Sequence, residues 1–320
     1  MRVLVGPNNF RLEQVITDLA GLYPQVQFAF CRDRKELMRE IADAEVFFGW
    51  LNREEFLAAR KLRWIQSPSS GVDRFLTIPE LREGSVILTS AVGTHSACLA
   101  EHALAMILAF TRGIRACVMH QQQRRWAIRE LRPTIVELTG ATLGIVGFGT
   151  VGRAIARRVQ AFEMRIVAVD MFPQAKPDYV ERLDGLAGLD ALLREADYVV
   201  VTVPYTAETR GMVGAAQLAL LKPSAILVGI SRGGIIDEAA LAQALRARRL
   251  AAAALDVFEQ EPLPEDSPLW EIDNLLITPH IAGGSQFESK IIREIFAENL
   301  GRYVRGEFPL RNQVDKARGF

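Results

Sequence analysis

The feature that most constrains this chain is a G-x-G-x-x-G motif at Gly147–Gly152, near the middle of its 320 residues. The apolar run Leu143–Val146 before it is typical of a buried strand, and Arg153–Phe162 after it has the apolar spacing of a helix. The next apolar run, Ile166–Val169, ends at Asp170. In this context the glycines let the backbone approach a pyrophosphate at a helix N-terminus, and the acid accepts hydrogen bonds from ribose hydroxyls. We therefore expect a dinucleotide site, although a lone motif of this kind also occurs as an ordinary strand-to-helix turn.

Composition argues against several other classes of protein. The chain has 38 basic and 38 acidic residues, so no overall charge favours nucleic acid or an anionic membrane as a partner. The most apolar helical segment, Ala97–Phe110, is interrupted by a glutamate and a histidine, and we do not expect it to span a membrane. The first apolar run is too short for a signal peptide. Because Cys31, Cys98 and Cys117 show no C-x-x-C spacing, we expect reduced thiols, no metal site and a cytoplasmic protein.

Strand-like and helical segments alternate on both sides of the glycine motif, which predicts parallel sheets covered by helices. The strand-like runs are Arg2–Val5, Val26–Phe30, Val46–Gly49, Trp64–Ser67 and Val86–Thr89 before the motif, and Tyr198–Val203, Ala225–Ile230, Ala251–Leu255 and Leu275–Thr278 after it. Helical spacing is found at Arg11–Gly21, Asp33–Ala42, Ala97–Ile114 and Phe287–Val304.

This pattern predicts an α/β fold with two Rossmann-like domains whose parallel sheets flank a cleft. Glycine-bearing joints near Gly93 and at Gly283–Gly284 are places where the chain could leave the first domain and return to it. We therefore expect a discontinuous first domain. Residues 1–95 with 285–320 would be the substrate (catalytic) domain, and residues 96–284 the dinucleotide-binding domain.

Four polar side chains follow predicted strands in the second half of the chain: Arg232, Asp256, Glu261 and His280. Ligands of an open parallel sheet bind outside the carboxyl ends of its strands, so we expect these residues to converge near the dinucleotide. An arginine can hold a carboxylate or ketone oxygen, a histidine can give or take a proton, and a carboxylate can orient that histidine. Taken singly, each has a plainer alternative as a structural histidine, a surface ion pair or a turn residue.

Ordered motifs cover most of the chain from about Leu62 to Gly283. They are Ser70–Asp73, Gly93–His95, Ala100–His102, Glu137–Gly140, Gly147–Gly152 with Asp170, Val203–Thr206 with Glu208 and Thr209, Ser231–Gly233, Leu255–Phe258 with Glu261–Leu263, and Thr278–His280. This set resembles the D-isomer-specific 2-hydroxyacid dehydrogenase family, and within it the glyoxylate/hydroxypyruvate reductase-like members.

The resemblance implies a role for each matching residue. Arg232 would anchor the substrate, His280 would donate the proton, and Glu261 would pair with His280 as the third catalytic residue. The cofactor would contact Gly147, Gly149, Thr150, Val151, Gly152, Asp170, Val203, Pro204, Thr209, Ile230, Ser231, Arg232, His280 and, beside the nicotinamide carboxamide, Asp256. The substrate would be held by Ser69, Ser70 and Gly71 together with Arg232.

We accordingly expect NAD(H)-dependent hydride transfer between a small 2-oxo acid and a D-2-hydroxy acid, of the glyoxylate or hydroxypyruvate type. Asp170 would repel a 2′-phosphate and has no arginine beside it, which favours NAD(H) over NADP(H). The alternative is a dinucleotide-sensing, corepressor-like binding protein on the same scaffold. The long apolar segment Ala97–Ile114 and the family's usual assembly suggest a homodimer through the cofactor domains.

Overall fold

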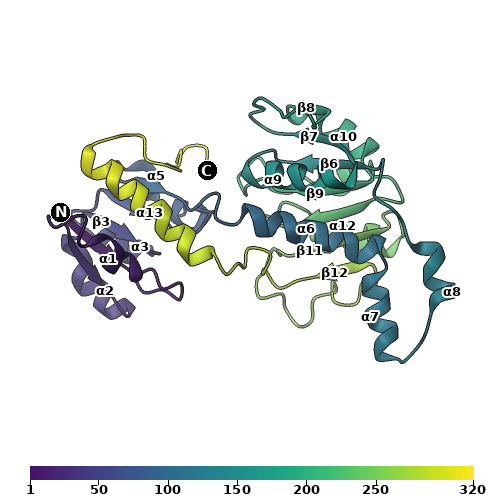
Figure 1. Ribbon diagram of the computed structural model, residues 1–320, viewed down its shortest axis with the longest axis horizontal. Helices are drawn as coiled ribbons and strands as arrows, with labels where there is room; N and C mark the ends of the chain where they lie inside the picture. Colours follow the sequence, from purple (N-terminus) through teal and green to yellow (C-terminus); the bar gives the residue numbers. More distant parts are fainter. The chain divides into compact units, whose positions relative to one another are not determined.

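The computed structural model describes residues 1–320, which form two compact units. Unit 1 consists of Met1–His95 and Ser285–Phe320, and unit 2 of Ser96–Gly284. Each unit holds one parallel sheet with helices on both faces (Figure 1). The expected α/β class with two Rossmann-like sheets is therefore confirmed.

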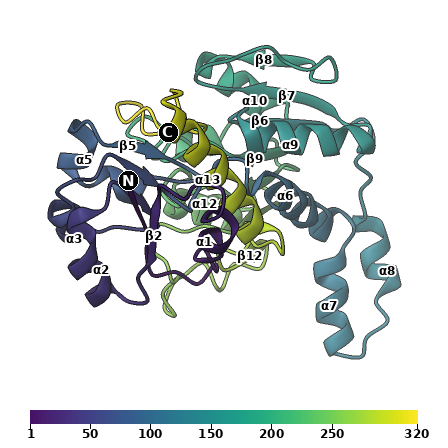
Figure 2. The same ribbon diagram turned by 60° about the vertical axis from the view of Figure 1, so that its left-hand side comes forward.

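Unit 1 has a five-stranded sheet in the order β2-β1-β3-β4-β5, with every neighbouring pair parallel. Helices α1 and α13, which lie side by side, cover one face (Figure 2), and α2 to α5 cover the other. Phe296 of α13 stacks on Phe48 with ring centroids 4.4 Å apart, so the C-terminal segment completes this core. The elements are β1 (Arg2–Val5), α1 (Gln14–Leu19), β2 (Gln27–Phe30), α2 (Arg34–Glu40), β3 (Val46–Phe48), α3 (Arg53–Ala58), β4 (Trp64–Gln66), α4 (Asp73–Leu76), α5 (Pro79–Glu83), β5 (Ile87–Thr89) and α13 (Glu288–Arg305).

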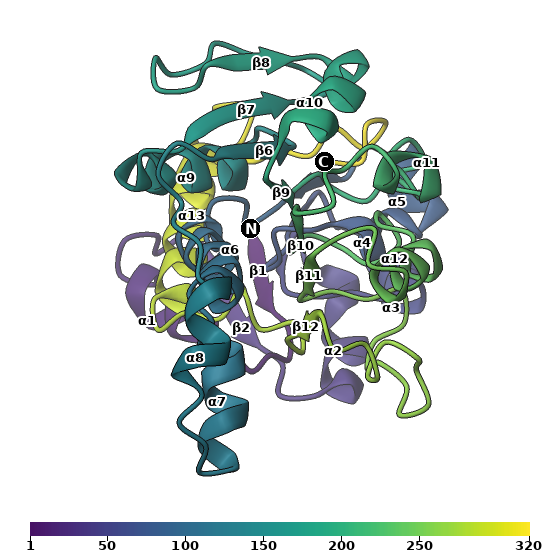
Figure 3. The same ribbon diagram turned by 90° about the vertical axis from the view of Figure 1, so that its right-hand side faces the viewer.

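Unit 2 has a seven-stranded parallel sheet in the order β12-β11-β10-β9-β6-β7-β8, which is seen edge to edge in Figure 3. Helices α6 and α9 cover one face, and α10, α11 and α12 cover the other. Strand β6 lies between β7 and β9, so the chain order reverses there and ligands are expected at its carboxyl end. The elements are α6 (Ser96–Thr111), α7 (Ile114–Gln122), α8 (Ile128–Leu131), β6 (Thr142–Val146), α9 (Thr150–Val159), β7 (Arg165–Val169), β8 (Arg182–Asp184), α10 (Leu189–Glu195), β9 (Tyr198–Val201), α11 (Ala215–Leu218), β10 (Ile226–Gly229), α12 (Glu238–Arg246), β11 (Ala252–Leu255) and β12 (Leu275–Ile277).

The prediction of one continuous helix over Ala97–Ile114 is wrong. Gly113 adopts a left-handed φ of +62°, which ends α6 and starts α7 in a new direction. The apolar side chains of α6 are buried against α9 in unit 2, whereas Ile114 is 52% exposed. Figures 1 and 3 both show α7 and α8 extending away from the sheet of unit 2.

No single helix is long and apolar enough to cross a membrane; α6 and α7 meet the requirement only when they are counted together, and they are bent by 64°.

Candidate active site

The glycine motif forms a tight turn between β6 and α9. Gly147 has a φ of +99°, and a Cβ atom there would lie 2.8 Å from the backbone nitrogen of Val203. A Cβ atom on Gly152 would lie 2.2 Å from the carbonyl oxygen of Gly147. At Gly149, by contrast, a Cβ atom would meet nothing within 4 Å. The turn is therefore closed on its inner side and open at Gly149.

The N-terminus of α9 opens beside this turn. Gly149 is its N-cap residue and supplies no side-chain acceptor, so the first backbone N–H groups of the helix, at Thr150 and Val151, are not capped. Gly149 and Thr150 are exposed. Uncapped N–H groups at a helix N-terminus favour an anion such as a pyrophosphate. These residues therefore fit the phosphates of a dinucleotide.

Asp170 lies at the end of β7, against the glycine turn. Its Oδ2 accepts the N–H of Phe148 at 2.6 Å, and its Oδ1 accepts the N–H of Phe172 at 2.8 Å. A carboxylate has about four acceptor positions, so both oxygens keep capacity for further donors. Asp170 is thus fixed beside the turn while it remains partly exposed.

The loop after β9 is stabilised from within by Thr209. This residue is buried, donates its hydroxyl to the carbonyl of Pro204 at 2.7 Å and accepts the N–H of Thr206 at 2.8 Å. Val203 is also buried, and Pro204 is exposed. Of the three cofactor contacts predicted in this loop, Pro204 thus presents the exposed surface, and the Thr209 hydroxyl holds the loop in shape.

Arg232 lies after β10, where the chain passes close to the loop that carries Glu261. Ile230 is buried, and the Arg232 Nη1 donates to the carbonyl of Ser231 at 2.8 Å. At the next residue, Gly233, a Cβ atom would lie 1.9 Å from the carbonyl oxygen of Phe258. Only glycine allows this approach, and it places Arg232 next to the Phe258–Glu261 segment.

Glu261 and His280 form a close pair in unit 2. The His280 Nδ1 lies 2.6 Å from the Glu261 Oε2, and the Glu261 Oε1 accepts the N–H of Phe258 at 3.0 Å. The side chain of Glu261 is 35% exposed and that of His280 is 46% exposed, so both can contact a ligand. His280 has a φ of +54°, a backbone conformation uncommon for a residue with a side chain.

A further carboxylate supports the loop of Glu261. Glu238 accepts the N–H of Glu259 at 2.5 Å. Burial raises the pKa of Glu238, and the nearby negative charges of Glu259 and Glu261 raise it further. The sequence analysis did not single out this residue, because 23 positions separate it from Glu261 and no motif links the two.

Asp256 is almost fully buried, with 1% of its surface exposed, and its carboxylate is bonded to the segment that carries His280. It accepts the Thr278 hydroxyl at 2.5 Å and the N–H groups of Ile281 and Ala282, each at 2.9 Å. His102 of α6 reaches the same hydroxyl, with its Nε2 3.1 Å away. These bonds hold the backbone on both sides of His280. Sequence reasoning missed Thr278 and His102 as supports of His280 because their partners are distant along the chain.

The predicted substrate residues Ser69, Ser70 and Gly71 belong to unit 1, in the loop after β4. The carbonyl of Ser69 accepts a hydrogen bond from the N–H of Ala91 at 2.9 Å, and the N–H of Ser69 donates to the Ser67 hydroxyl at 3.1 Å. The N–H groups of Ser70 and Gly71 make no hydrogen bond within the chain. This loop is thus anchored at Ser69 and offers two backbone donors.

Comparison of the sequence with known protein families shows which family the chain belongs to. The sequence model for "D-isomer specific 2-hydroxyacid dehydrogenase, NAD binding domain" matches residues 104–282, more than half of the chain. The chain belongs to the D-isomer specific 2-hydroxyacid dehydrogenase family. The resemblance predicted from the motifs is therefore confirmed, and the matched region lies within unit 2.

Several members of this family are similar over most of the chain. The D-3-phosphoglycerate dehydrogenase of Archaeoglobus fulgidus is 35% identical over 287 residues, which are 88% of this chain and 53% of that protein. This chain therefore spans about half the length of that relative. The glyoxylate reductase of Korarchaeum cryptofilum is 34% identical over 284 residues, or 86% of this chain and 84% of that protein. Among solved structures, the NADPH-dependent glyoxylate/hydroxypyruvate reductase of Sinorhizobium meliloti, in complex with NADP and sulfate, covers 100% of both chains with a TM-score of 0.87 and 29% identity.

Proposed function

We propose that this 2-hydroxyacid dehydrogenase reduces a short 2-oxo acid to the D-2-hydroxy acid with NAD(H), and catalyses the reverse oxidation. The observation that carries the proposal is the His280–Glu261 pair, whose nitrogen and oxygen lie 2.6 Å apart in the unit that also holds the glycine turn. Glyoxylate and hydroxypyruvate are the substrates we favour. The serine hydroxyls of the Ser69–Gly71 loop suit a small polar substrate better than a branched apolar one.

The residues divide the chemistry between them. The bound nicotinamide supplies or accepts the hydride. His280 gives a proton to the substrate oxygen during reduction and takes it back during oxidation, and Glu261 fixes the orientation of the ring. Arg232 holds the carboxylate and carbonyl oxygens with its planar guanidinium group. The free N–H groups of Ser70 and Gly71 are further donors to the carboxylate.

The preference for NAD(H) rests on Asp170. Its carboxylate lies 2.6 Å from the Phe148 nitrogen, beside the turn that fits the phosphates. At this position it would accept hydrogen bonds from the ribose hydroxyls and repel a 2′-phosphate. The Sinorhizobium meliloti reductase is NADPH-dependent, so the proposed preference for NADH would distinguish this protein from that one. We expect a higher kcat/KM with NADH than with NADPH, and a smaller difference in Asp170→Ala. A clear preference of the unaltered protein for NADPH would contradict this assignment.

The function is tested by measuring NADH consumption with glyoxylate, hydroxypyruvate and pyruvate in parallel with NADH binding. We expect turnover with at least one of the first two. Binding of NADH without turnover of any 2-oxo acid would instead indicate a dinucleotide-sensing protein on the same scaffold.

We further propose that the protein forms a homodimer. Helices α7 and α8 and the loop between them extend from unit 2 (Figure 2). They expose Val118, Met119, Ile128 and, in the loop, Trp126, which is 90% exposed. A monomer rarely leaves such a group of apolar side chains in water. A second copy that covers them would bury this surface, in agreement with the family's usual assembly.

A further inference from the structure

A chain of polar contacts in unit 1 runs through His95. The Ser70 hydroxyl lies 3.0 Å from the His95 Nδ1, and the His95 Nε2 lies 2.8 Å from the Glu288 Oε1. The side chains of His95 and Glu288 are 15% and 22% exposed, so water screens this pair only in part. A single imidazole thus bridges a serine and a glutamate that are 218 positions apart in the sequence.

Ser70 belongs to the Ser69–Gly71 loop, whose backbone offers two N–H groups without a partner in the chain. The Ser70 hydroxyl lies 3.1 Å from the carbonyl of Ala91 and 3.0 Å from the His95 Nδ1, and when the imidazole N–H faces Glu288 its single proton bonds to one of these two acceptors at a time. The neighbouring Ser69 is fixed through its carbonyl to the N–H of Ala91. The hydroxyl of Ser70 is therefore committed to structure, and what the loop offers to a ligand is the pair of N–H groups at Ser70 and Gly71.

The other two residues stand where the chain leaves unit 1 and where it returns. His95 is the last residue before unit 2 begins, and Glu288 is the first residue of α13, three positions after the chain re-enters at Ser285. The imidazole therefore ties the Ser69–Gly71 loop to both connecting segments. A displacement of either segment within unit 1 would therefore change the position of His95 and, through it, of the Ser70 hydroxyl.

We infer that His95 is a positioning residue for the substrate carboxylate. It holds Ser70 so that the N–H groups of Ser70 and Gly71 point to one place, and Glu288 fixes the orientation of the imidazole. This inference rests on the proposed function, because it takes the Ser69–Gly71 loop as the part of unit 1 that binds the 2-oxo acid. His95 does not touch the reacting atoms in this role.

Two substitutions at His95 separate its contacts. The amide of His95→Asn falls near the place of Nδ1 and can keep the bond to Ser70, whereas the longer His95→Gln places its amide near Nε2 and can keep only the bond to Glu288. We expect His95→Gln to raise the KM for glyoxylate or hydroxypyruvate about tenfold, the effect of losing one partly buried hydrogen bond. We expect His95→Asn to raise the same KM less than about threefold. Neither variant should change the Kd for NADH, measured by fluorescence.

Ser70→Ala and Glu288→Gln complete the test. Ser70→Ala should raise the KM at least as much as His95→Gln, because it removes the hydroxyl from both His95 and the Ala91 carbonyl. Glu288→Gln should have a smaller effect on KM since its amide oxygen still accepts the imidazole N–H. The inference is overturned if His95→Gln and His95→Asn leave the substrate KM within twofold of the unaltered protein. It is also overturned if both raise the KM equally together with a lower Tm, which marks a purely structural histidine. A protein that is inert toward every 2-oxo acid before any substitution would instead refute the proposed function, and this inference with it.

Discussion

The catalytic proposal depends on two side chains whose geometry is fixed by others. His280 sits on a strained backbone, and Asp256 secures that backbone with three hydrogen bonds from Thr278, Ile281 and Ala282. Glu261 is fixed in the same way, through the bond that its carboxylate accepts from the N–H of Phe258. Preorganisation of this kind keeps an acid–base pair ready for proton transfer without rearrangement.

Replacement of His280 and of Glu261 should have different consequences. His280→Ala removes the proposed proton donor and should lower kcat by about 10²–10⁴. Glu261→Gln keeps a hydrogen-bond partner for the imidazole, so the ring stays oriented and the loss of kcat should be smaller, about tenfold. Steady-state rates at saturating NADH and substrate measure both effects. An equal loss of kcat in the two variants would contradict this division of roles.

The open space at Gly149 gives a direct test of the cofactor site. Gly149→Ala adds a methyl group that meets no protein atom, so the fold should be unaffected, but the group would lie where the phosphates are expected. We expect the Kd for NADH to rise about tenfold with an unchanged Tm. Gly185→Ala is a matched control in the same unit, because a Cβ atom there also meets nothing within 4 Å and the backbone is extended. Equal Kd values for both variants would place the cofactor elsewhere.

Among the secondary-structure elements, the long C-terminal helix and all strands except β8 could be predicted, whereas strand β8 and the break between α6 and α7 could not. The run Phe287–Val304 predicted α13, which spans Glu288–Arg305, because its apolar spacing matches the face it buries. Strand β8 is an edge strand of the sheet, and the sequence does not predict it because its residues Arg182 and Asp184 are polar. The break at Gly113 was missed because a glycine within an apolar pattern does not by itself reveal a left-handed φ.

In the candidate site, too, only the residues that follow a local sequence pattern could be predicted. The residue types and their places after successive strands predicted Arg232, Glu261 and His280 as one group, since all parallel strands end at the same edge of the sheet. The supports of these residues could not be predicted. Glu238 and His102 contribute through contacts between distant parts of the chain, and such contacts depend on packing that no local pattern encodes.

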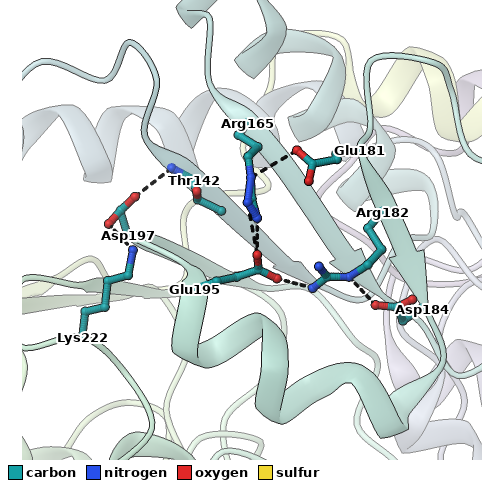
Figure 4. Close-up of polar contacts among 8 residues, drawn as sticks. All are labelled: Thr142, Arg165, Glu181, Arg182, Asp184, Glu195, Asp197 and Lys222. Atoms are coloured by element: carbon teal, nitrogen blue, oxygen red, sulfur yellow. Dashed lines mark hydrogen bonds and ion pairs between the residues drawn. The ribbon is translucent and has the colours of Figure 1, made fainter.

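A network of ion pairs joins elements at the other edge of the unit 2 sheet, where the strands begin (Figure 4). Glu195, the last residue of α10, accepts hydrogen bonds from Arg165 of β7 and Arg182 of β8. Nearby, Asp197 accepts the N–H of Thr142 at 2.8 Å and the Lys222 ammonium at 2.7 Å. Burial raises the pKa of Glu195, but the bonds from Arg182 and Arg165 outweigh it and lower the pKa below its ordinary value of 4.5.

Glu195 should therefore stabilise the fold in a pH-dependent way. A depressed pKa means that the contribution is present above the ordinary value and is lost as the pH falls through the value in the folded protein. We expect Glu195→Gln to lower the free energy of unfolding by about 1–2 kcal/mol at neutral pH, and by less at acidic pH. Urea unfolding at both pH values measures this. Glu181→Gln, whose exposed carboxylate pairs with Arg165 alone, should cost less than about 0.5 kcal/mol, and an equal loss in the two variants would contradict the assignment.

At the scale of the whole molecule, the exposed apolar side chains of α7 and α8 predict the oligomeric state. Val118→Asp combined with Trp126→Ala should convert a dimer into a monomer, because it places a charge in the proposed interface and removes its largest side chain. Light scattering after size-exclusion chromatography gives the mass. Leu22→Asp, which changes a single exposed leucine of unit 1, should leave the dimer intact. A monomeric unaltered protein at micromolar concentration would refute the dimer.

The handedness of the product tests the whole proposal most directly. Reduction of hydroxypyruvate with NADH creates one new stereocentre. In the proposed reaction its configuration depends on which face of the carbonyl meets the nicotinamide when Arg232 and His280 bind the substrate oxygens. Chiral chromatography of the glycerate formed by the unaltered protein measures this configuration. We predict D-glycerate alone, formed about 10²–10⁴ times more slowly in His280→Ala. Formation of L-glycerate would contradict the proposed reaction.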